Sequence, residues 1–328
     1  MKLVTFAVST PIGRFERLGA LLGERIVDLQ AAFAAFLSAE GKAQPLRLAE
    51  TDIPQDMRAF LETGRCGWSA VERGMRFAQA ALSAGERARG PRGELIFHDP
   101  SAGRLLAPLP RPASLRDFLT FESHAKVGFA RRDEQIPPAW YQMPVYYKGN
   151  HRSILGPDAE VRWPRYTEKL DYELELACVI GREGRDISVE DAPGYIAGYT
   201  VMNDWSARDI QRAEMSTRLG PAKAKDFATS IGPCLVTPDE LDPRNLRMIA
   251  RVNGEVWSEG NSGSSHLTFP QMIAHVSMDE TIYPGDLFGS GTVGGGCGLE
   301  LDRWLAPGDV VELEIEGIGV LRNRVVKP

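Results

Sequence analysis

The part of the chain that follows Leu105 consists of short apolar runs separated by proline and glycine, and this pattern limits the fold more than any other feature. Pro-Gly-Asp stands at 284–286 and again at 307–309, each time before apolar residues, which is typical of a turn at the entrance to a strand. Few stretches show the longer period of a helix, so a parallel sheet connected by helices is disfavoured. We therefore predict an α+β, mainly β core, whose clearest strands are 174–180, 196–202, 248–252 and 310–316.

The first hundred residues show a different pattern, which predicts a small α/β domain. It combines apolar strands, a hairpin around Gly23-Glu24 and alanine-rich helices that stop at glycine. The predicted strands are 3–8, 17–22 and 25–29, and the predicted helices are 31–39 and 69–84. A stretch rich in glycine and arginine follows at 85–91. We expect an N-terminal domain of residues 1–100 and a larger domain of residues 101–328.

Charge and composition exclude several classes of protein. The 328 residues carry a net charge of −6, which argues against a broad nucleic-acid-binding surface. The 4 cysteines lie far apart, so neither a zinc ribbon nor a dense disulfide framework fits. The first apolar run, 3–8, is shorter than a secretory signal requires, and no run has the length of a membrane-spanning helix. We expect a cytoplasmic protein with no nucleic-acid or membrane partner.

Three familiar motifs do not apply to this chain. Gly289-x-Gly291-x-x-Gly294 matches the dinucleotide-binding fingerprint, but glycines and small residues continue to Gly298 and will not begin the helix that such a site needs. No serine lies in the G-x-S-x-G elbow of triad hydrolases. The 5 histidines include no H-E-x-x-H pair, which excludes that type of zinc protease.

Glu173 and Glu175 are the first candidates for chemistry. Residues two apart on a strand share a face, so both carboxylates point the same way. Two like charges at this spacing need water or a cation between them, and oxygen ligands favour Mg²⁺, Mn²⁺ or Ca²⁺. The alternative is a strand with one solvated face, because Glu312, Glu314 and Glu316 show the same spacing.

A second candidate set follows the strand 196–202. Asp204, Arg208 and Gln211 are spaced i, i+4 and i+7 and so predict one helical face. A carboxylate, a guanidinium and an amide in a row can hold a metal at one end and an anionic substrate along the rest. The alternative is that Asn203 or Asp204 caps the helix.

A third candidate set is Asp117 with His124, which lie two helical turns apart on a predicted helix. A histidine can act as a base because its pKa lies near the working pH. The alternative is a capping box formed by Ser114 and Asp117, with His124 as an ordinary polar residue.

Taken together, these segments resemble the fumarylacetoacetate hydrolase family over residues 105–326. The most specific motif is Asn-Asp-Trp-Ser-Ala-Arg-Asp-Ile-Gln at 203–211, and Tyr-Glu-Leu-Glu-Leu-Ala precedes it at 172–177. The other matches, in chain order, are Asp117-Phe118, His124-Ala125, Gly220-Pro221 with Lys225, Ser290-Gly291-Thr292 and Leu299-Glu300-Leu301.

The resemblance implies a mixed β-roll core in a catalytic domain, a bound Mg²⁺ or Mn²⁺ (sometimes Ca²⁺) and a homodimer. By position, the implied metal ligands are Asp117, Glu173, Glu175 and Asp204. The implied catalytic residues are His124 and Glu300, which activate water, and Lys225, which stabilises an oxyanion. The implied substrate-binding residues are Arg208, Gln211, Tyr147 and Thr292.

The implied reaction is metal-dependent hydrolysis of a C–C bond in a β-diketo acid, such as an acylpyruvate, fumarylpyruvate or a compound like fumarylacetoacetate. The alternative is an isomerase or decarboxylase of a 2-oxo acid at the same site, of the 2-hydroxyhepta-2,4-dienedioate isomerase or oxaloacetate decarboxylase type. A third interpretation is a non-catalytic metal-binding or structural protein. It is disfavoured because the implied site residues are all intact, which a non-catalytic protein would not require. Leu119 and Met215 replace tyrosines of the animal enzymes, which disfavours fumarylacetoacetate itself.

The segment around His124 adds two expectations. A local cluster of cations predicts attraction of a small anionic substrate and consists of Arg131, Arg132, Lys148 and Arg152. The charged, proline-containing stretch 128–138 predicts a lid that brings His124 to Glu300 when substrate binds.

Overall fold

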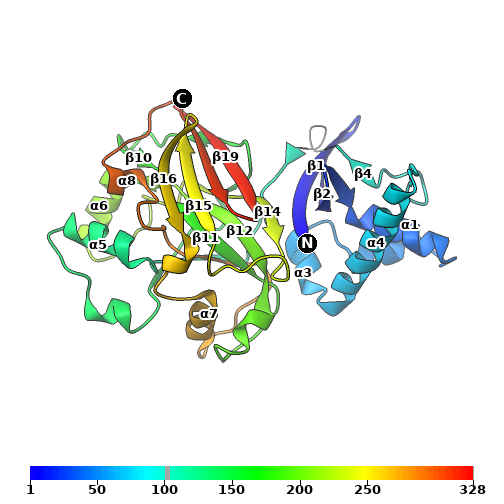
Figure 1. Cartoon of the computed structure of the whole chain (residues 1–328), viewed down its shortest axis with the longest axis horizontal. Coiled ribbons are helices and arrows are strands. Elements are labelled where there is room, and N and C mark those ends of the chain that lie inside the picture. Colours follow the sequence, from blue (N-terminus) through cyan, green and yellow to red (C-terminus); the bar gives the residue numbers. More distant parts are fainter. Residues whose placement is uncertain (100–103, 328) are drawn as a thin grey trace.

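The computed structural model describes residues 1–99 and 104–327, which form two parts connected by one sheet (Figure 1). The N-terminal part, drawn in blue and cyan, lies at one end of the molecule, and the larger part carries the C-terminus. The predicted domain boundary between residues 100 and 101 lies outside the described residues. The α+β fold, with a mixed-sheet core and a small α/β part at the N-terminus, is as predicted.

The N-terminal part begins with an antiparallel meander. Its strands are β1 (Lys2–Thr10), β2 (Gly13–Leu22) and β3 (Arg25–Asp28), and the short β4 (Phe97–His98) adds to β3. Leu18 and Ala20, which lie two residues apart on β2, belong to the same buried cluster as Phe33 and Val71 from the helices of this part.

Four helices cover this meander, of which two were predicted. Asp28 accepts a hydrogen bond from the Ala31 backbone N–H and caps α1 (Leu29–Ala39), which packs against α4 (Arg65–Ser83). The shorter α2 (Pro45–Asp52) and α3 (Met57–Glu62) were missed, because neither is long enough to show a clear apolar period.

The large sheet runs through both parts of the molecule. β1 pairs antiparallel with β14 (Thr229–Val236), with Lys2 opposite Val236. The strand order is β4-β3-β2-β1-β14-β12-β11-β17-β6-β7, with β5 beside β1 and β8 beside β14. The remaining strands of this sheet are β5 (Arg104–Leu105), β6 (Ser114–Phe118), β7 (Tyr146–Lys148), β8 (Ile154–Leu155), β11 (Leu174–Ile180), β12 (Ile196–Asp204) and β17 (Asp286–Gly289).

A second sheet packs over the first and has the order β16-β15-β18-β19-β9. Its strands are β9 (Glu160–Arg162), β15 (Arg247–Val252), β16 (Glu255–Asn261), β18 (Val310–Ile315) and β19 (Gly319–Val326). A separate ribbon pairs β10 (Leu170–Asp171) with β13 (Ser206–Ala207). The four strands predicted from the apolar runs are all confirmed as β11, β12, β15 and β18.

The strand β11 is buried on both faces. Glu175 on this strand and Glu173 just before it therefore lie inside the molecule. Leu174 and Leu176 belong to the core between the two sheets. Ala177 and Val179, on the opposite face, belong to a second core that includes Leu3 of the N-terminal part. Neither face of β11 is solvated, so the alternative interpretation of its glutamates does not hold.

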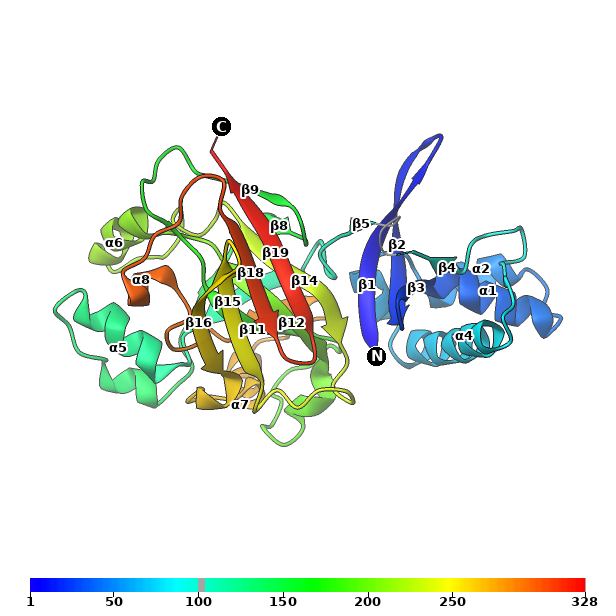
Figure 2. The ribbon, with the colours of Figure 1, turned by 45° about the horizontal axis from the view of Figure 1, so that its top comes forward.

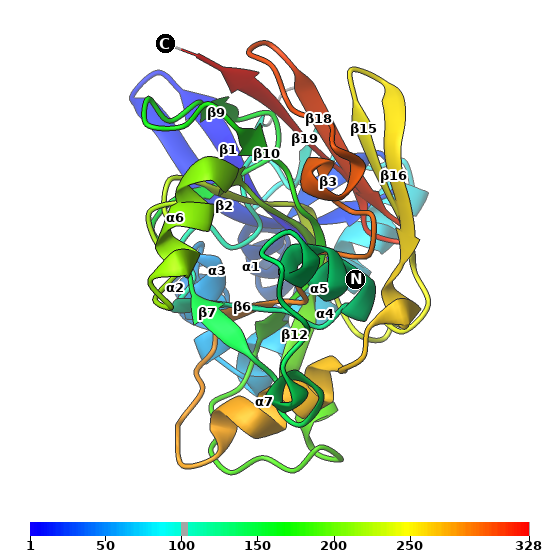
Figure 3. The same cartoon turned by 90° about the vertical axis from the view of Figure 1, so that its left-hand side faces the viewer.

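Three helices gather at the end of the molecule opposite the N-terminal part (Figures 1 and 2). They are α5 (Glu122–Ala130), α6 (Arg208–Ser216) and α8 (Gly298–Leu301), and Figure 3 looks onto this end. The other helical segments are α7 (Phe269–Ser277) and the 3₁₀ turns η1 (Pro138–Tyr141), η2 (Ala192–Tyr195) and η3 (Ser262–Ser264). None of the described helices combines the length and apolar character needed to cross a membrane.

Two helical predictions were wrong. Asp117 lies on β6, which pairs in parallel with β17, and the helix that carries His124 begins only at Glu122. Asp204 ends β12, and α6 begins at Arg208 after a cap residue that makes no side-chain bond. In both places a polar residue lies at or next to the end of a buried strand, and tertiary pairing overrides the local helical spacing. The proposed caps at these positions do not form either.

Candidate active site

Four buried carboxylates meet at one end of the large sheet. Asp117 lies on β6, Glu173 precedes β11, Glu175 lies on β11 and Asp204 ends β12. One oxygen atom from each of the four lies within 4.8 Å of those of the others. The structure therefore brings together all four predicted metal ligands, and the predicted shared face of Glu173 and Glu175 puts both in this cluster.

A glycine keeps the space between two of these carboxylates open. Gly289 ends β17, the strand between β11 and β6, and lies opposite Asp117 and Ala177 in the sheet. A Cβ atom added to Gly289 would lie 2.5 Å from Asp117 Oδ1 and 2.9 Å from Glu175 Oε2. Any side chain at this position would therefore occupy the centre of the cluster.

The cluster suits a hard divalent cation. Asp117 Oδ1 and Asp204 Oδ1 are buried and have no hydrogen-bond partner among the described residues, although buried polar atoms normally have one. Burial and neighbouring carboxylates raise the pKa of both Asp117 and Glu175. Oxygen-only donors of this kind are the ligands that Mg²⁺, Mn²⁺ and Ca²⁺ prefer. The residues present thus fit the cation that the resemblance implies.

Two buried cations hold the other side of the cluster. Lys225 Nζ contacts carboxylate oxygens of both Glu173 and Asp204. Arg208 Nη1 lies 2.8 Å from Glu173 Oε1. Burial opposes ionisation of Glu173, but Arg208 and Lys225 outweigh it and hold the pKa of this carboxyl below its usual range. Glu173 is therefore the carboxylate of the cluster that is most stable as an anion.

Asp171 is a site residue that the sequence did not identify. Its carboxylate lies 2.8 Å from Arg208 Nε and accepts hydrogen bonds from the backbone N–H groups of Gly298 at 2.8 Å and Leu299 at 3.0 Å. It therefore ties α6 to the first turn of α8, the helix that carries Glu300. The sequence did contain one indication of its role, because Asp171 is a third acidic residue, two positions before Glu173, at the entrance to a buried strand.

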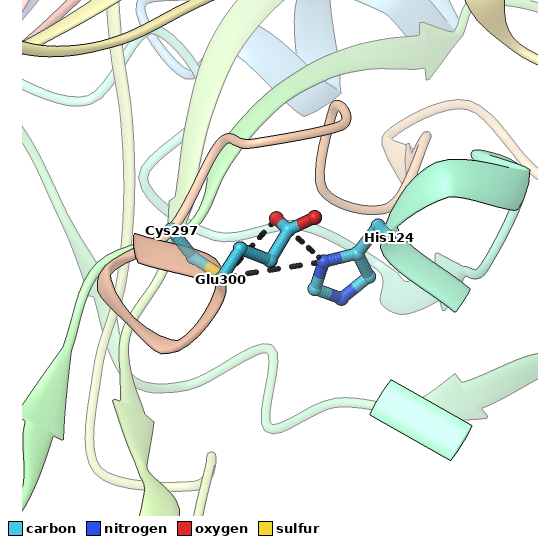
Figure 4. A group of neighbouring side chains, drawn as sticks. All are labelled: His124, Cys297 and Glu300. Atoms are coloured by element: carbon cyan, nitrogen blue, oxygen red, sulfur yellow. Dashed lines mark hydrogen bonds and ion pairs between the residues drawn. The ribbon is translucent and has the colours of Figure 1, made fainter. Parts of the chain in front are cut away.

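His124 and Glu300 form a hydrogen-bonded pair (Figure 4). His124 Nδ1 lies 3.0 Å from Glu300 Oε2, and Glu300 Oε1 accepts a bond from the Gly295 N–H at 3.0 Å. A carboxylate can only accept here, so the proton of the neutral imidazole sits on Nδ1 and Nε2 is the free nitrogen. Nε2 lies 3.9 Å from Glu173 Oε1. The predicted pairing of His124 with Glu300 is present.

Cys297 is a second residue that the sequence did not identify at this place. Its Sγ atom lies 3.4 Å from Glu300 Oε2 and 3.9 Å from His124 Nδ1, as Figure 4 shows. Burial opposes ionisation of Glu300, but the bonds from His124, Gly295 and Cys297 hold its pKa below the ordinary value. The thiol thus completes the set of donors around the Glu300 carboxylate.

The predicted substrate-binding residues surround the carboxylate cluster. Tyr147 donates its phenol hydrogen to Asp204 Oδ2 at 2.7 Å. Gln211 accepts a bond from Arg208 Nη1 at 2.9 Å, while Arg208 Nη2 is buried with no partner among the described residues. Thr292 Oγ1 lies 3.4 Å from Glu175 Oε1. Arg208 therefore keeps one buried guanidinium nitrogen without a hydrogen-bond partner among the described residues.

These groups open into a cavity of about 630 Å³, a size typical of small-molecule sites. Leu119 and Met215, the two departures from the animal enzymes, both line it. Of the predicted cluster of cations, Arg131 and Arg132 line the cavity, whereas Lys148 and Arg152 are not among its lining residues. The other site residues on its walls are Asp117, His124, Tyr147, Glu173, Glu175, Arg208, Gln211, Lys225 and Thr292.

Comparison with known proteins agrees with this geometry. The sequence model of the fumarylacetoacetate (FAA) hydrolase C-terminal family matches residues 115–326. The protein "Oxaloacetate tautomerase FAHD2A, mitochondrial" of Homo sapiens is 34% identical over 284 residues, covering 86% of this chain and 83% of the relative. "Oxaloacetate tautomerase YisK" of Bacillus subtilis (strain 168) is 32% identical over 262 residues, covering 78% of this chain and 84% of the relative.

A solved structure shares the whole fold. Maleylpyruvate hydrolase from Sphingobium sp. SYK-6, in complex with manganese(II) and pyruvate, superposes with a TM-score of 0.67 at 23% identity. The match covers 100% of this chain and 99% of that one. The motifs, the four-carboxylate site and the match to residues 115–326 lead to one conclusion: the chain belongs to the fumarylacetoacetate hydrolase family.

Proposed function

We propose that this protein is a divalent-cation-dependent tautomerase of a 2-oxo acid of the oxaloacetate type, which interconverts the enol and keto forms. The observation that carries the proposal is the His124–Glu300 pair beside the four-carboxylate cluster, with His124 and three of the four carboxylates lining one cavity. Two relatives with at least 32% identity are named oxaloacetate tautomerases. They support the isomerase alternative better than C–C hydrolysis.

Asp117, Glu173, Glu175 and Asp204 would hold the cation, which we propose to be Mg²⁺ or Mn²⁺, with Ca²⁺ as a further possibility. The related maleylpyruvate hydrolase binds manganese(II) together with pyruvate. When bound, such a cation polarises the oxygens of a 2-oxo acid and so favours the enolate.

The chain's own residues supply the proton transfer. His124 presents Nε2 to the cavity while Glu300 holds its Nδ1–H. We propose that Nε2 takes the enol hydroxyl proton and that a proton returns from Nε2 to C3 of the substrate, so that one proton moves from oxygen to carbon. Arg208 and Lys225 stay protonated and stabilise the negative oxygen between these steps.

Hydrolysis of a C–C bond is the second candidate. An imidazole oriented by a carboxylate can also take a proton from water, and the same His124–Glu300 geometry permits this. The maleylpyruvate hydrolase similarity supports the shared fold only. Decarboxylation of a 2-oxo acid would likewise use the polarised carbonyl.

One assay separates these reactions. Oxaloacetate, acetylpyruvate, fumarylpyruvate and fumarylacetoacetate are each supplied with Mn²⁺, and enol absorbance, acid products and CO₂ are followed. We expect faster enol-to-keto conversion of oxaloacetate, abolished by EDTA and reduced about 100-fold or more in His124→Ala. Two acid products from a diketo acid would replace the proposal with hydrolysis, and CO₂ release would replace it with decarboxylation.

Assembly and location are further proposals. We propose a homodimer, as the resemblance implies, which light scattering of the purified protein tests. We also keep the prediction of a cytoplasmic protein with a small anionic substrate and without nucleic-acid or membrane partners, although the human relative is named mitochondrial.

A further inference from the structure

Four cations outside the carboxylate cluster line the cavity, namely Arg131, Arg132, Lys169 and Arg212. Two of them already have partners. Arg131 lies 3.8 Å from Asp302 and donates to the Leu299 carbonyl, and Arg132 lies 3.1 Å from Glu134. Lys169 and Arg212 are exposed, and neither has a carboxylate within ion-pair distance among the residues that the structure describes. Their charge is therefore available to a ligand.

Local structure keeps these two side chains on the same wall. The Lys169 carbonyl accepts a hydrogen bond from the N–H of Arg208 at 2.9 Å, and Arg208 is the first residue of α6. Arg212 follows one helical turn later. Lys169 Nζ lies 4.9 Å from the centre of the Trp304 ring, which also lines the cavity. A cation–π contact orients the ammonium without neutralising it.

The one acidic residue on this part of the wall does not compete for these cations. Asp209 lines the cavity, but its carboxylate accepts bonds from the Thr167 hydroxyl and from the N–H groups of Glu168 and Ile210. The Asp209 oxygens are thus already hydrogen-bonded to the neighbouring backbone and to the Thr167 hydroxyl.

The inner end of the cavity offers little positive charge for a second anion. Its carboxylates, Asp117, Asp171, Glu173, Glu175 and Asp204, outnumber the buried cations Arg208 and Lys225. A divalent cation there would offset two of these three excess negative charges. A ligand with two carboxylates must therefore find its second positive partner elsewhere on the wall.

We infer that Lys169 and Arg212 form a subsite for the distal carboxylate of a dicarboxylic 2-oxo acid. The inference rests on the proposed function, because it places the reacting 2-oxo end of the substrate at the carboxylate cluster. The inference goes further by naming two residues, Lys169 and Arg212, that would bind the second carboxylate of the substrate. The cavity of about 630 Å³ has room for a dicarboxylic acid.

The first test compares a substrate that carries the distal charge with one in which a methyl ester removes it. Oxaloacetate and its 4-methyl ester are assayed with wild-type protein, Lys169→Met, Arg212→Met and the double variant. We expect kcat/KM for oxaloacetate to fall about tenfold for each cation removed, and kcat/KM for the ester to change less than twofold. Arg14→Met is the matched control, since Arg14 is an exposed cation of β2 without an ion pair among the described residues.

The second test does not depend on turnover. Calorimetry in the presence of Mn²⁺ compares 2-oxoglutarate with 2-oxopentanoate, which has a methyl group in place of the distal carboxylate. We expect the wild-type protein to bind 2-oxoglutarate at least tenfold more tightly, and the double variant to bind both acids with similar affinity. Arg14→Met should keep the wild-type preference.

Each outcome decides one of the two proposals. Equal affinity of the wild-type protein for the two acids, undetectable binding of both, or an unchanged preference in the double variant overturns the subsite. A wild-type preference lost in the double variant, together with no tautomerisation of oxaloacetate, keeps the subsite and overturns the proposed function.

Discussion

At the scale of single residues, Asp117 and Glu175 bear most of the electrostatic cost of the site. Both are buried, and the ammonium of Lys225 contacts Glu173 and Asp204 rather than these two. Desolvation and neighbouring carboxylates therefore disfavour their anionic forms. The groups that would bind the cation are also those that weaken the fold without it.

Asp117→Asn tests this balance. At neutral pH the metal-free fold must bury this carboxyl either charged or protonated, and both cost free energy that an amide avoids, so we expect the metal-free protein to gain about 1–3 kcal/mol in its free energy of unfolding. We also expect the stabilisation by Mn²⁺ to disappear. Urea unfolding with and without Mn²⁺ measures both effects. Glu312→Gln on β18 is the control and should change neither, because Glu312 makes only a surface ion pair with Arg322 at 3.6 Å. Undiminished Mn²⁺ stabilisation in Asp117→Asn would contradict the ligand assignment.

The raised pKa values of Asp117 and Glu175 also predict a pH dependence. In the metal-free folded protein these groups hold protons that the unfolded chain releases near pH 4, so their contribution to stability falls as the pH rises above that value. A cation binds the deprotonated carboxylates, so we expect tighter Mn²⁺ binding at pH 7.5 than at pH 5.5 and release of protons on binding. Calorimetry in buffers of different ionisation enthalpy measures this release. Binding that is independent of pH, without proton release, would show that these carboxylates are not the ligands.

The sequence pointed to the chemical residues better than to the residues that support them. The four carboxylates and the His124–Glu300 pair come together as predicted. Asp171 and Cys297 were missed, because their roles depend on partners that lie far away in the sequence, such as Gly298 for Asp171 and His124 for Cys297. Contacts of this kind leave no local periodic signal.

At the scale of elements, Asp171 connects three segments of the site. It ends β10, pairs with Arg208 of α6 and binds the first N–H groups of α8. The relative position of Arg208 and Glu300 therefore depends on one carboxylate.

Asp171→Asn should weaken the connection between β10, α6 and α8. The change removes one of the two carboxylates that pair with the buried Arg208, the other being Glu173, and we expect a loss of about 3–5 kcal/mol in the free energy of unfolding. Activity should fall with it, since Glu300 loses its fixed position. Chemical unfolding and steady-state kinetics check both. Asp209→Asn, a partly exposed carboxylate of α6, should have a much smaller effect on stability; equal effects would contradict the connecting role.

The elements that were predicted wrongly share one physical cause. Asp204 ends a buried strand and Asp117 is the next-to-last residue of another. A helix follows each strand, so the spacing of both residues to later polar residues imitates a helical face. The pairing of β6 with β17 decides the outcome, and this pairing joins residues that are more than 150 positions apart. Local spacing cannot report such a partner.

At the scale of the whole molecule, the two predicted domains share a sheet and a core. Leu3 and Leu18 of the N-terminal part belong to the same buried cluster as Ile231 and Leu235 of the larger part. We still propose the division near residue 100 as the boundary of two compact units, but we expect neither to be independent. The sequence showed the change of pattern between the two parts and could not show the pairing between them.

Removal of residues 1–99 tests this dependence. We expect the remaining fragment to aggregate or to lack a cooperative unfolding transition, because the deletion exposes the apolar residues that face β1. In the full chain, Leu235→Ala should cost about 2–5 kcal/mol, whereas Leu48→Ala, at a position that is 43% exposed, should cost far less. Size-exclusion chromatography and thermal unfolding measure these effects. A soluble, cooperatively unfolding fragment would show that the larger part is an independent domain.

The pairing of Lys2 with Val236 also governs the order of events during synthesis. β1 leaves the ribosome well before its partner β14, because the paired residues Lys2 and Val236 lie more than 200 positions apart. Until then one edge of the N-terminal meander stays open to other strands, including those of neighbouring nascent chains. The large sheet can therefore close only after β14 has been made, and until then the unpaired edge of β1 is exposed to unwanted strand pairing.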